Sequence, residues 1–167
     1  MAENIDKALQ RSRRNLPHWQ AGGRTYFVTW NCIAGESLRV QERAIVVEAA
    51  TKFHGDRYNM FALVVMPDHV HMLIQPLEKS PKLWWHLGRL LGGMKGASAR
   101  KINASRGRNG ALWQEESFDR LLREGEFEDK WNYIRLNPVR AGLVGKPDDY
   151  DALWIRSTAD GWMQPDL

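Results

Sequence analysis

The sequence YNMFALVVMPDHVHMLIQ, residues 58–75, contains two apolar runs separated by the pair Pro67-Asp68. Proline presets one position of a tight turn, and aspartate suits another. The first run is almost wholly apolar at its end, which is typical of a central strand of a sheet. The stretch therefore predicts two antiparallel strands, 58–66 and 69–75, joined by a tight turn.

The second strand carries two histidines, His69 and His71, on either side of Val70. Alternate residues of a strand point the same way, so both imidazoles share one face while Val70, Met72 and Ile74 share the other. Two neutral imidazoles on one face are half of a divalent-metal site. The plainer alternative is a pair of structural histidines.

The segments on either side give an order of strand, helix, strand, strand, helix, strand. This order is the split βαβ of a ferredoxin-like fold, an α+β sandwich whose antiparallel sheet carries helices on one face. An extra helix, ended by Pro138, follows the last strand. The expected elements are strands at 24–33 and 118–123, a short strand at 112–113, and helices at 39–54, 81–102 and 126–136.

The chain of 167 residues fits one domain with a substantial core. We expect a basic N-terminal arm over 1–22, the main domain over 23–146 and an irregular tail over 147–167. The arm contains three arginines that suit a DNA backbone: Arg11, Arg13 and Arg14. No apolar run approaches the roughly 20 residues that cross a bilayer. With one cysteine, Cys32, and no apolar signal core, the sequence predicts a cytoplasmic protein and excludes structural zinc sites built on cysteines.

Positive charge is concentrated in one part of the chain. Residues 80–110 hold seven basic residues and no acidic ones, whereas the rest holds 17 basic and 20 acidic residues. A local basic stretch is typical of binding to a phosphate backbone, although a solvated helix face is the alternative. The basic residues are Lys82, Arg89, Lys95, Arg100, Lys101, Arg106 and Arg108.

Tyr133 and Asn137 are four residues apart in the last predicted helix, so they share one helix face. A tyrosine in an amphipathic helix is ordinarily a core residue. Combined with the histidine pair, however, a single tyrosine nucleophile suits an enzyme that cuts single-stranded DNA. Asn137 or Asp68 can supply the oxygen ligand that the metal still needs.

The run GRLLGGMKG, residues 88–96, is similar to the phosphate-binding P-loop. Its lysine, Lys95, comes one residue late, and Gly96 occupies the place of the metal-binding hydroxyl. The run also lies inside a predicted helix and does not follow a strand. We therefore expect no nucleotide binding or hydrolysis.

Five ordered runs match a known family. They are RNLPHW (14–19), TYFVT (25–29), MPDHVH (66–71), WQ with SFDR (113–120) and YI with NPVRAGL (133–143). On these runs the chain resembles the single-tyrosine HUH transposases, specifically the REP-associated tyrosine transposase branch of the IS200-like family. The matching runs extend over residues from about 14 to 144.

The resemblance implies that His69 and His71 bind Mg²⁺ or Mn²⁺ and that Tyr133 is the nucleophile. The third ligand falls on Asn137, with Asp68 in reserve. The implied reaction cleaves and rejoins single-stranded DNA beside hairpins, such as bacterial repetitive extragenic palindromes (REP), through a covalent 5′-phosphotyrosine. The expected DNA contacts are Arg11, Arg13, Arg14, Arg89, Lys95, Arg100, Lys101, Arg106 and Arg108, with Trp84, Trp85 and Trp113 as candidates for stacking on bases.

Two other functions share these features. A transposase-derived regulator would bind DNA hairpins without cleaving them, and a metal-dependent phosphohydrolase would use the histidine pair with a water nucleophile. We expect a nucleoid-associated monomer, with a dimer as the alternative, because the sheet and the tyrosine helix can meet within one chain.

Overall fold

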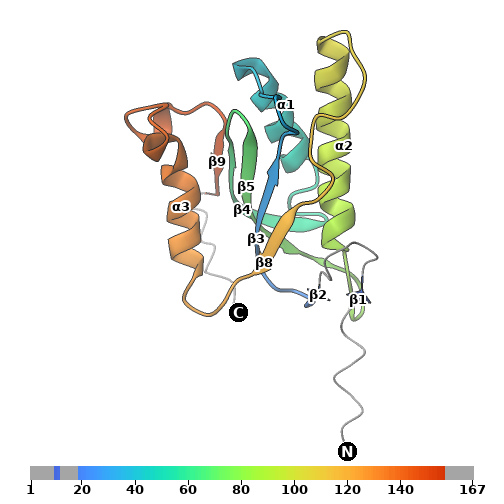
Figure 1. The fold of residues 1–167 in the computed structure, drawn as a ribbon. Coiled ribbons are helices and arrows are strands. Elements are labelled where there is room, and N and C mark those ends of the chain that lie inside the picture. The colour runs from blue at the N-terminus through green and yellow to red at the C-terminus, as the bar shows by residue number, and fades with distance from the viewer. Residues whose placement is uncertain (1–9, 12–18, 157–167) are drawn as a thin grey trace, which may run out of the picture.

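The structure is a computed structural model that describes residues 10–11 and 19–156 (Figure 1). Its principal elements are β3 (Tyr26–Asn31), α1 (Val40–Thr51), β4 (Tyr58–Val65), β5 (His69–Pro76), α2 (Leu87–Ser105), β8 (Phe118–Leu121), α3 (Phe127–Arg140), η1 (Pro147–Asp149) and β9 (Leu153–Ile155). Short two-stranded sheets are formed by β1 (Gln10–Arg11) with β2 (Trp19–Gln20), and by β6 (Glu78–Ser80) with β7 (Leu83–Trp84).

The main sheet has the strand order β8-β3-β5-β4-β9, and every neighbouring pair is antiparallel. The first four strands in this order, with α1 and α2 as the crossovers, make the split βαβ of a ferredoxin-like fold. The predicted α+β fold is therefore confirmed. The turn after β4 is closed by Met66, whose N–H donates to the carbonyl of His69 at 2.8 Å.

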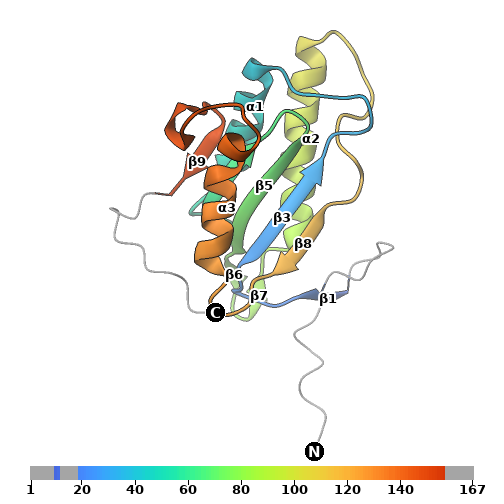
Figure 2. The same cartoon turned by 60° about the vertical axis from the view of Figure 1, so that its left-hand side comes forward.

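Helices α1 and α2 cover one face of the sheet, and α3 packs on the other (Figures 1 and 2). On the α2 side, the Trp30 and Trp113 rings meet edge to face, and the Trp113 indole donates to Ser98 of α2 at 3.1 Å. On the α3 side, Phe61 of β4 meets Phe127 of α3 with ring centroids 5.2 Å apart. The extra helix thus covers part of the face that carries the two histidines.

Helix α2 begins at Leu87, not at the predicted residue 81. Pro81 instead lies in the turn between β6 and β7, where the next residue, Lys82, has a positive φ of 63°. The first helical N–H is capped from a distance, because the Leu87 N–H donates to Oε1 of Gln20 at 2.8 Å. The predicted start was wrong because a hairpin and a remote cap decide where this helix begins.

Helix α3 runs through Pro138 to Arg140, so the predicted end at the proline was wrong. Pro138 lies in the last turn, where its ring removes only one hydrogen bond of the helix. Later N–H groups still close that turn: Ala141 donates to the Asn137 carbonyl at 3.0 Å, and Leu143 donates to the Pro138 carbonyl at 2.9 Å. Asn137 therefore stays helical, one turn after Tyr133.

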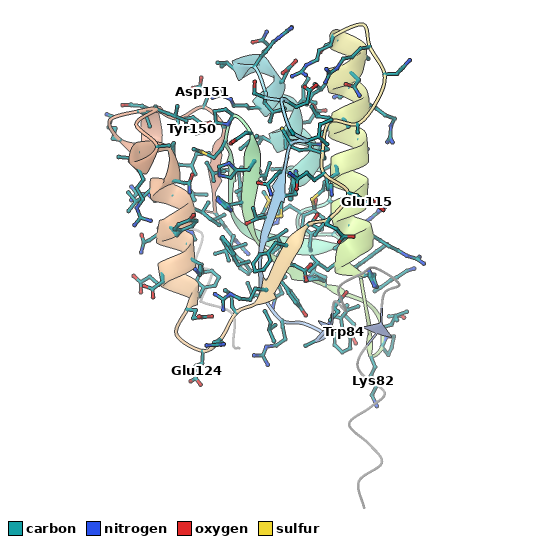
Figure 3. The ribbon with its side chains drawn as sticks, in the orientation of Figure 1. Lys82, Trp84, Glu115, Glu124, Tyr150 and Asp151 are labelled. Carbon is teal, nitrogen blue, oxygen red and sulfur yellow. The ribbon has the colours of Figure 1, made fainter. Side chains whose placement is uncertain are left out.

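The predicted irregular tail is also wrong, because Pro147–Asp149 form η1 and Leu153–Ile155 form β9. Strand β9 pairs with β4 and protects that edge of the sheet, and Tyr150 donates its hydroxyl to the Val65 carbonyl at 2.7 Å (Figure 3). The predicted strand at 112–113 is reduced to a single bridge between Cys32 and Trp113. Across the described residues, no helix has the length and apolar character to cross a membrane.

Candidate active site

The register of the sheet positions both histidines. His71 lies opposite Thr29 of β3, and His69 lies opposite Asn31. Because residues paired across two strands share a face, His69, His71 and Thr29 all point toward the α3 side. The two imidazole rings lie 4.7 Å apart between centroids. The predicted pair on one face is therefore present.

Each imidazole is held through its Nδ1 atom. Thr29 Oγ1 lies 2.8 Å from Nδ1 of His71, and Asp68 Oδ1 lies 2.6 Å from Nδ1 of His69. Metal-binding histidines are commonly oriented in this way through the nitrogen that does not bind the metal. The arrangement leaves Nε2 of both rings as the atoms that can bind an ion. Asp68 therefore contacts His69 through Nδ1 and not through the nitrogen that can bind an ion.

The electrostatics of His71 suit metal binding. Its side chain is buried, and this desolvation, with smaller contributions from His69 and Lys130, lowers its pKa to about 4. His71 is therefore neutral at pH 7. A metal ligand must present an unprotonated nitrogen, so no proton has to be displaced when an ion binds.

Tyr133 of α3 completes the cluster. Its ring lies 5.3 Å from the His71 ring and 5.9 Å from the Phe27 ring, between centroids. Two cations lie beside the same ring: Lys130 Nζ and the Arg140 guanidinium are each 5.6 Å from its centroid. These two cations give the surroundings of the phenol a positive charge, which attracts a phosphate group.

Within the described chain, no third histidine, cysteine, aspartate or glutamate joins the pair as a metal ligand. A third protein ligand would therefore be a donor of another kind, such as the amide oxygen that the sequence offers. Asn137 is buried at 9% exposure and lies one turn after Tyr133 on α3. Two imidazoles with one amide oxygen suit a divalent ion that keeps other positions open for water or phosphate.

Several predicted DNA contacts have partners inside the protein. Arg106 is bound by Glu42 and Glu36, each at 2.7 Å, and its side chain is only 9% exposed. Arg108 pairs with Glu36 at 2.6 Å, and Lys101 pairs with Glu48 at 2.7 Å. These glutamates belong to α1 and the loop before it. The segment 80–110, which contains no acidic residue, therefore pairs with acidic residues from another part of the chain.

Lys95 and Trp113 also contact the rest of the fold. Lys95 Nζ donates to the Glu115 carbonyl at 2.8 Å and lies 3.2 Å from Ser117 Oγ (Figure 3). Trp113 is 7% exposed and packs in the core, which leaves no open ring face for a base. We therefore leave Trp113 and Arg106 out of the proposed DNA surface.

The remaining predicted contacts fall in three places. Arg89 and Arg100 are exposed on α2 and line a large cavity. Arg11 lies in β1, and its side chain is outside the described part of the structure. Arg13 and Arg14 lie outside the described residues altogether.

Phe118 is a further site residue that sequence reasoning missed. It is 62% exposed, and it pairs with Thr29, which places it on the histidine face of the edge strand β8. Its position in the SFDR run was visible, but its exposure was not, because a phenylalanine in a predicted strand is ordinarily buried. Thr29 was missed in the same way, as it lies 42 residues from His71.

Comparisons with known proteins give the family of the chain. The family model described as "Transposase IS200 like" matches residues 31–134. Among solved structures, a REP-associated tyrosine transposase bound to a REP hairpin has a TM-score of 0.71 at 21% identity, over 92% of this chain and 90% of that one. A candidate transposase from Deinococcus radiodurans R1 has a TM-score of 0.42 at 17% identity, over 75% and 95% of the two chains. No curated protein matches. Because the family model covers more than half of the sequence, the chain belongs to the IS200-like transposase family.

Proposed function

We propose that this protein is a metal-dependent transposase that cleaves and rejoins single-stranded DNA beside hairpins, with Tyr133 as its nucleophile. The observation that carries the proposal is the meeting of three side chains on one face of the sheet. The His71 ring lies 4.7 Å from the His69 ring and 5.3 Å from the Tyr133 ring.

The residues fit a divalent ion such as Mg²⁺ or Mn²⁺. His69 and His71 would hold it through Nε2 and Asn137 through its amide oxygen, while Asp68 and Thr29 orient the two rings. When bound, the ion would polarise the scissile phosphate. Asp68 thus has an orienting role in this proposal, because its carboxylate contacts the Nδ1 atom of His69.

In the proposed reaction the Tyr133 hydroxyl attacks the scissile phosphorus. The phenol loses its proton, an Oη–P bond forms and the bond from phosphorus to the 3′ oxygen breaks. The departing oxygen gains a proton and becomes a 3′-hydroxyl, while the 5′ phosphate stays on the tyrosine. Attack by a 3′-hydroxyl reverses these changes, so rejoining needs no nucleotide hydrolysis.

Positive charge around Tyr133 supports this chemistry. Lys130 and Arg140 lie beside its ring, where their positive charge favours an approaching phosphate. Phe118, exposed on the neighbouring edge strand, offers a surface on which a base next to the scissile phosphate can stack. That a structure of the same fold is bound to a REP hairpin supports hairpin DNA as the substrate.

One chain contains both halves of the proposed site, since Tyr133 contacts its own His71. We therefore propose that a monomer is active. A mixture of Tyr133→Phe with His71→Ala tests this directly. Each variant lacks one half of the site, so the mixture is expected to stay inactive, whereas a site shared between subunits would recover activity.

The proposal is tested with labelled single-stranded DNA that contains a REP-type hairpin, in Mg²⁺ or Mn²⁺. Wild-type protein should form a labelled band that survives on a denaturing protein gel, while Tyr133→Phe and His71→Ala should not. Tyr150→Phe is the matched control, because it removes a tyrosine hydroxyl outside the site. Cleavage that persists in Tyr133→Phe would indicate a water nucleophile, and binding without cleavage would indicate a regulator.

A further inference from the structure

A cavity of about 1170 Å³ lies on the opposite side of the sheet from the histidines. Its walls are the end of α1, the first part of α2 and the β6–β7 hairpin, with Trp84 on that hairpin (Figure 3). Tyr26 and Asp119 form part of its lining. These two residues alternate with Phe27 and Phe118, which face the active site, so the sheet separates the two places.

The lining of the cavity is strongly basic. One acidic residue, Asp119, is accompanied by five cationic ones, which come from the segment after α1, from β6 and from α2: Lys52, Arg57, Lys79, Arg89 and Arg100. Such an excess of positive charge attracts a polyanion. The lining includes two of the arginines that the sequence analysis assigned to DNA binding, Arg89 and Arg100. The arginines that pair with Glu36 are not among these residues.

Aromatic rings are interleaved with these charges. The guanidinium of Arg57 lies 3.6 Å from the Phe53 ring centroid and 4.7 Å from that of Trp85, and Lys79 Nζ lies 4.9 Å from the Trp85 ring. Trp84 lies against Gly22, where a Cβ atom would come within 2.4 Å of its ring. The two indole rings are half-buried. Proteins that bind unpaired nucleotides commonly combine cations with aromatic rings, since bases stack on the rings and phosphates contact the cations.

Two glycines of α2, Gly92 and Gly93, form part of the cavity wall. Both are exposed and lie inside the helix, where glycine is unfavourable. A Cβ atom added at either would meet nothing within 4 Å, so packing among the described residues does not require them. They leave room for a ligand to approach the helix between Arg89 and Arg100.

We propose that this cavity binds unpaired nucleotides that flank the hairpin, with bases against the tryptophans and phosphates at Arg89 and Arg100. This inference rests on the proposed function, because it assigns part of the same DNA. The bound strand would then pass around the edge strand β8 to reach Tyr133. Phe118 lies along that path, on the active-site side of β8.

Gly93→Leu places a large side chain in the cavity, and leucine is more favourable than glycine in a helix. A loss of DNA binding in this variant would therefore not result from a loss of stability. The test is the affinity of this variant for DNA, measured by fluorescence anisotropy in a Tyr133→Phe background. Two DNAs are compared: a hairpin with single-stranded flanks and the same hairpin with blunt ends. Affinity for the flanked DNA should fall about tenfold or more, and affinity for the blunt hairpin should not change. The melting temperature should equal or exceed that of the parent.

Ala104→Leu is the matched control, since it adds the same kind of bulk to α2 at an exposed position outside the cavity. It should leave both affinities unchanged. Equal binding of flanked DNA by Gly93→Leu and Ala104→Leu would overturn the proposal. So would an equal loss for the blunt hairpin, because the cavity would then take paired DNA.

The salt dependence of binding gives a second readout. Arg89→Ala should lower the slope of log affinity against log salt concentration by about 1, as expected when one phosphate contact is lost. Lys101→Ala, on the same helix but paired with Glu48, should leave the slope unchanged. An unchanged slope in Arg89→Ala would contradict a phosphate contact at that residue.

These experiments separate the cavity from the catalytic proposal. If wild-type protein forms the covalent adduct but Gly93→Leu binds flanked DNA normally, the cavity proposal fails and the proposed function stands. If no adduct forms but Gly93→Leu loses the flanked DNA selectively, the cavity proposal stands and the catalytic role of Tyr133 fails.

Discussion

At the scale of single residues, the hydroxyl of Thr29 should matter to metal binding. Its Oγ1 lies 2.8 Å from Nδ1 of His71, so Thr29→Val removes the group that orients that ring. Loss of such an orienting partner typically lowers metal affinity about 10- to 100-fold. We expect a loss of this size for Mn²⁺, measured by electron paramagnetic resonance titration.

Thr25 provides a matched control for this substitution. It is buried and precedes the same strand, but its Oγ1 has no hydrogen-bond partner among the described residues. Thr25→Val should therefore leave Mn²⁺ affinity unchanged. Equal affinities in the two variants would show that Thr29 does not orient His71.

Phe118 should matter to DNA binding rather than to folding, because its side chain is 62% exposed. Stacking of one base on an aromatic ring contributes about 1–3 kcal/mol, which corresponds to roughly 5- to 150-fold in affinity. Phe118→Ala should lose affinity for single-stranded DNA in this range and keep its melting temperature. Leu143→Ala, at an exposed apolar side chain after α3, should lose none, and a similar small loss in both would refute the stacking role.

At the scale of elements, Arg106 holds the end of α2 against the start of α1. It pairs with Glu42, whose side chain is 2% exposed, so Arg106→Ala leaves a buried carboxylate without its partner. Breaking a buried pair in this way costs about 3–5 kcal/mol. We expect a loss of that size in the free energy of unfolding, measured with urea.

The exposed pair between Lys101 and Glu48 lies between the same two helices and serves as the control. Lys101→Ala should change the free energy of unfolding far less than Arg106→Ala, because water screens an exposed pair. If Arg106→Ala instead kept its stability and lost DNA affinity, the arginine would be a DNA contact, as the sequence suggested.

The same cluster should make stability depend on pH. Hydrogen bonds from Arg108 and then Arg106 hold the pKa of Glu36 at about 2, below its usual value of 4.5. A carboxylate with a lowered pKa stabilises the folded state above pH 4.5 and loses this effect as the pH falls toward 2. We expect this contribution of Glu36 to the free energy of unfolding to disappear over this interval. Glu36→Gln should flatten the pH profile of urea unfolding there, and an unchanged profile would contradict the assignment.

The limits of elements show what local sequence can predict. The alternation around Val70 and the pair Pro67-Asp68 predicted β4, β5 and the shared face of the histidines, because a strand repeats every two residues. The start of α2 depends on Gln20, 67 residues away from the N–H that it caps. The path of α3 through Pro138 depends on which N–H groups close its last turn. Hydrogen bonds to distant residues, or at the end of a helix, leave no periodic pattern in the sequence.

At the scale of the whole molecule, the sequence predicted the split βαβ order but not the fifth strand. Residues Leu153–Ile155 are too few to show a pattern, and only the exposed edge of β4 gives them a partner. The sequence predicted the amount of positive charge in residues 80–110, but not which of these basic residues pair with acidic side chains. Arg106 and Arg108 meet Glu36, whereas Arg89 and Arg100 line the cavity. The meeting of Tyr133 with His71 was implied by family resemblance, since nothing local joins positions 62 residues apart.

The central claim is that Tyr133 forms the covalent bond to DNA, and peptide mapping of the trapped complex tests it most directly. After wild-type protein reacts with hairpin DNA, nuclease and protease digestion leaves a modified peptide for mass spectrometry. The account predicts one residue carrying a 5′-linked nucleotide, Tyr133. A nucleotide found on any other residue, or cleaved DNA without a modified peptide, would contradict it.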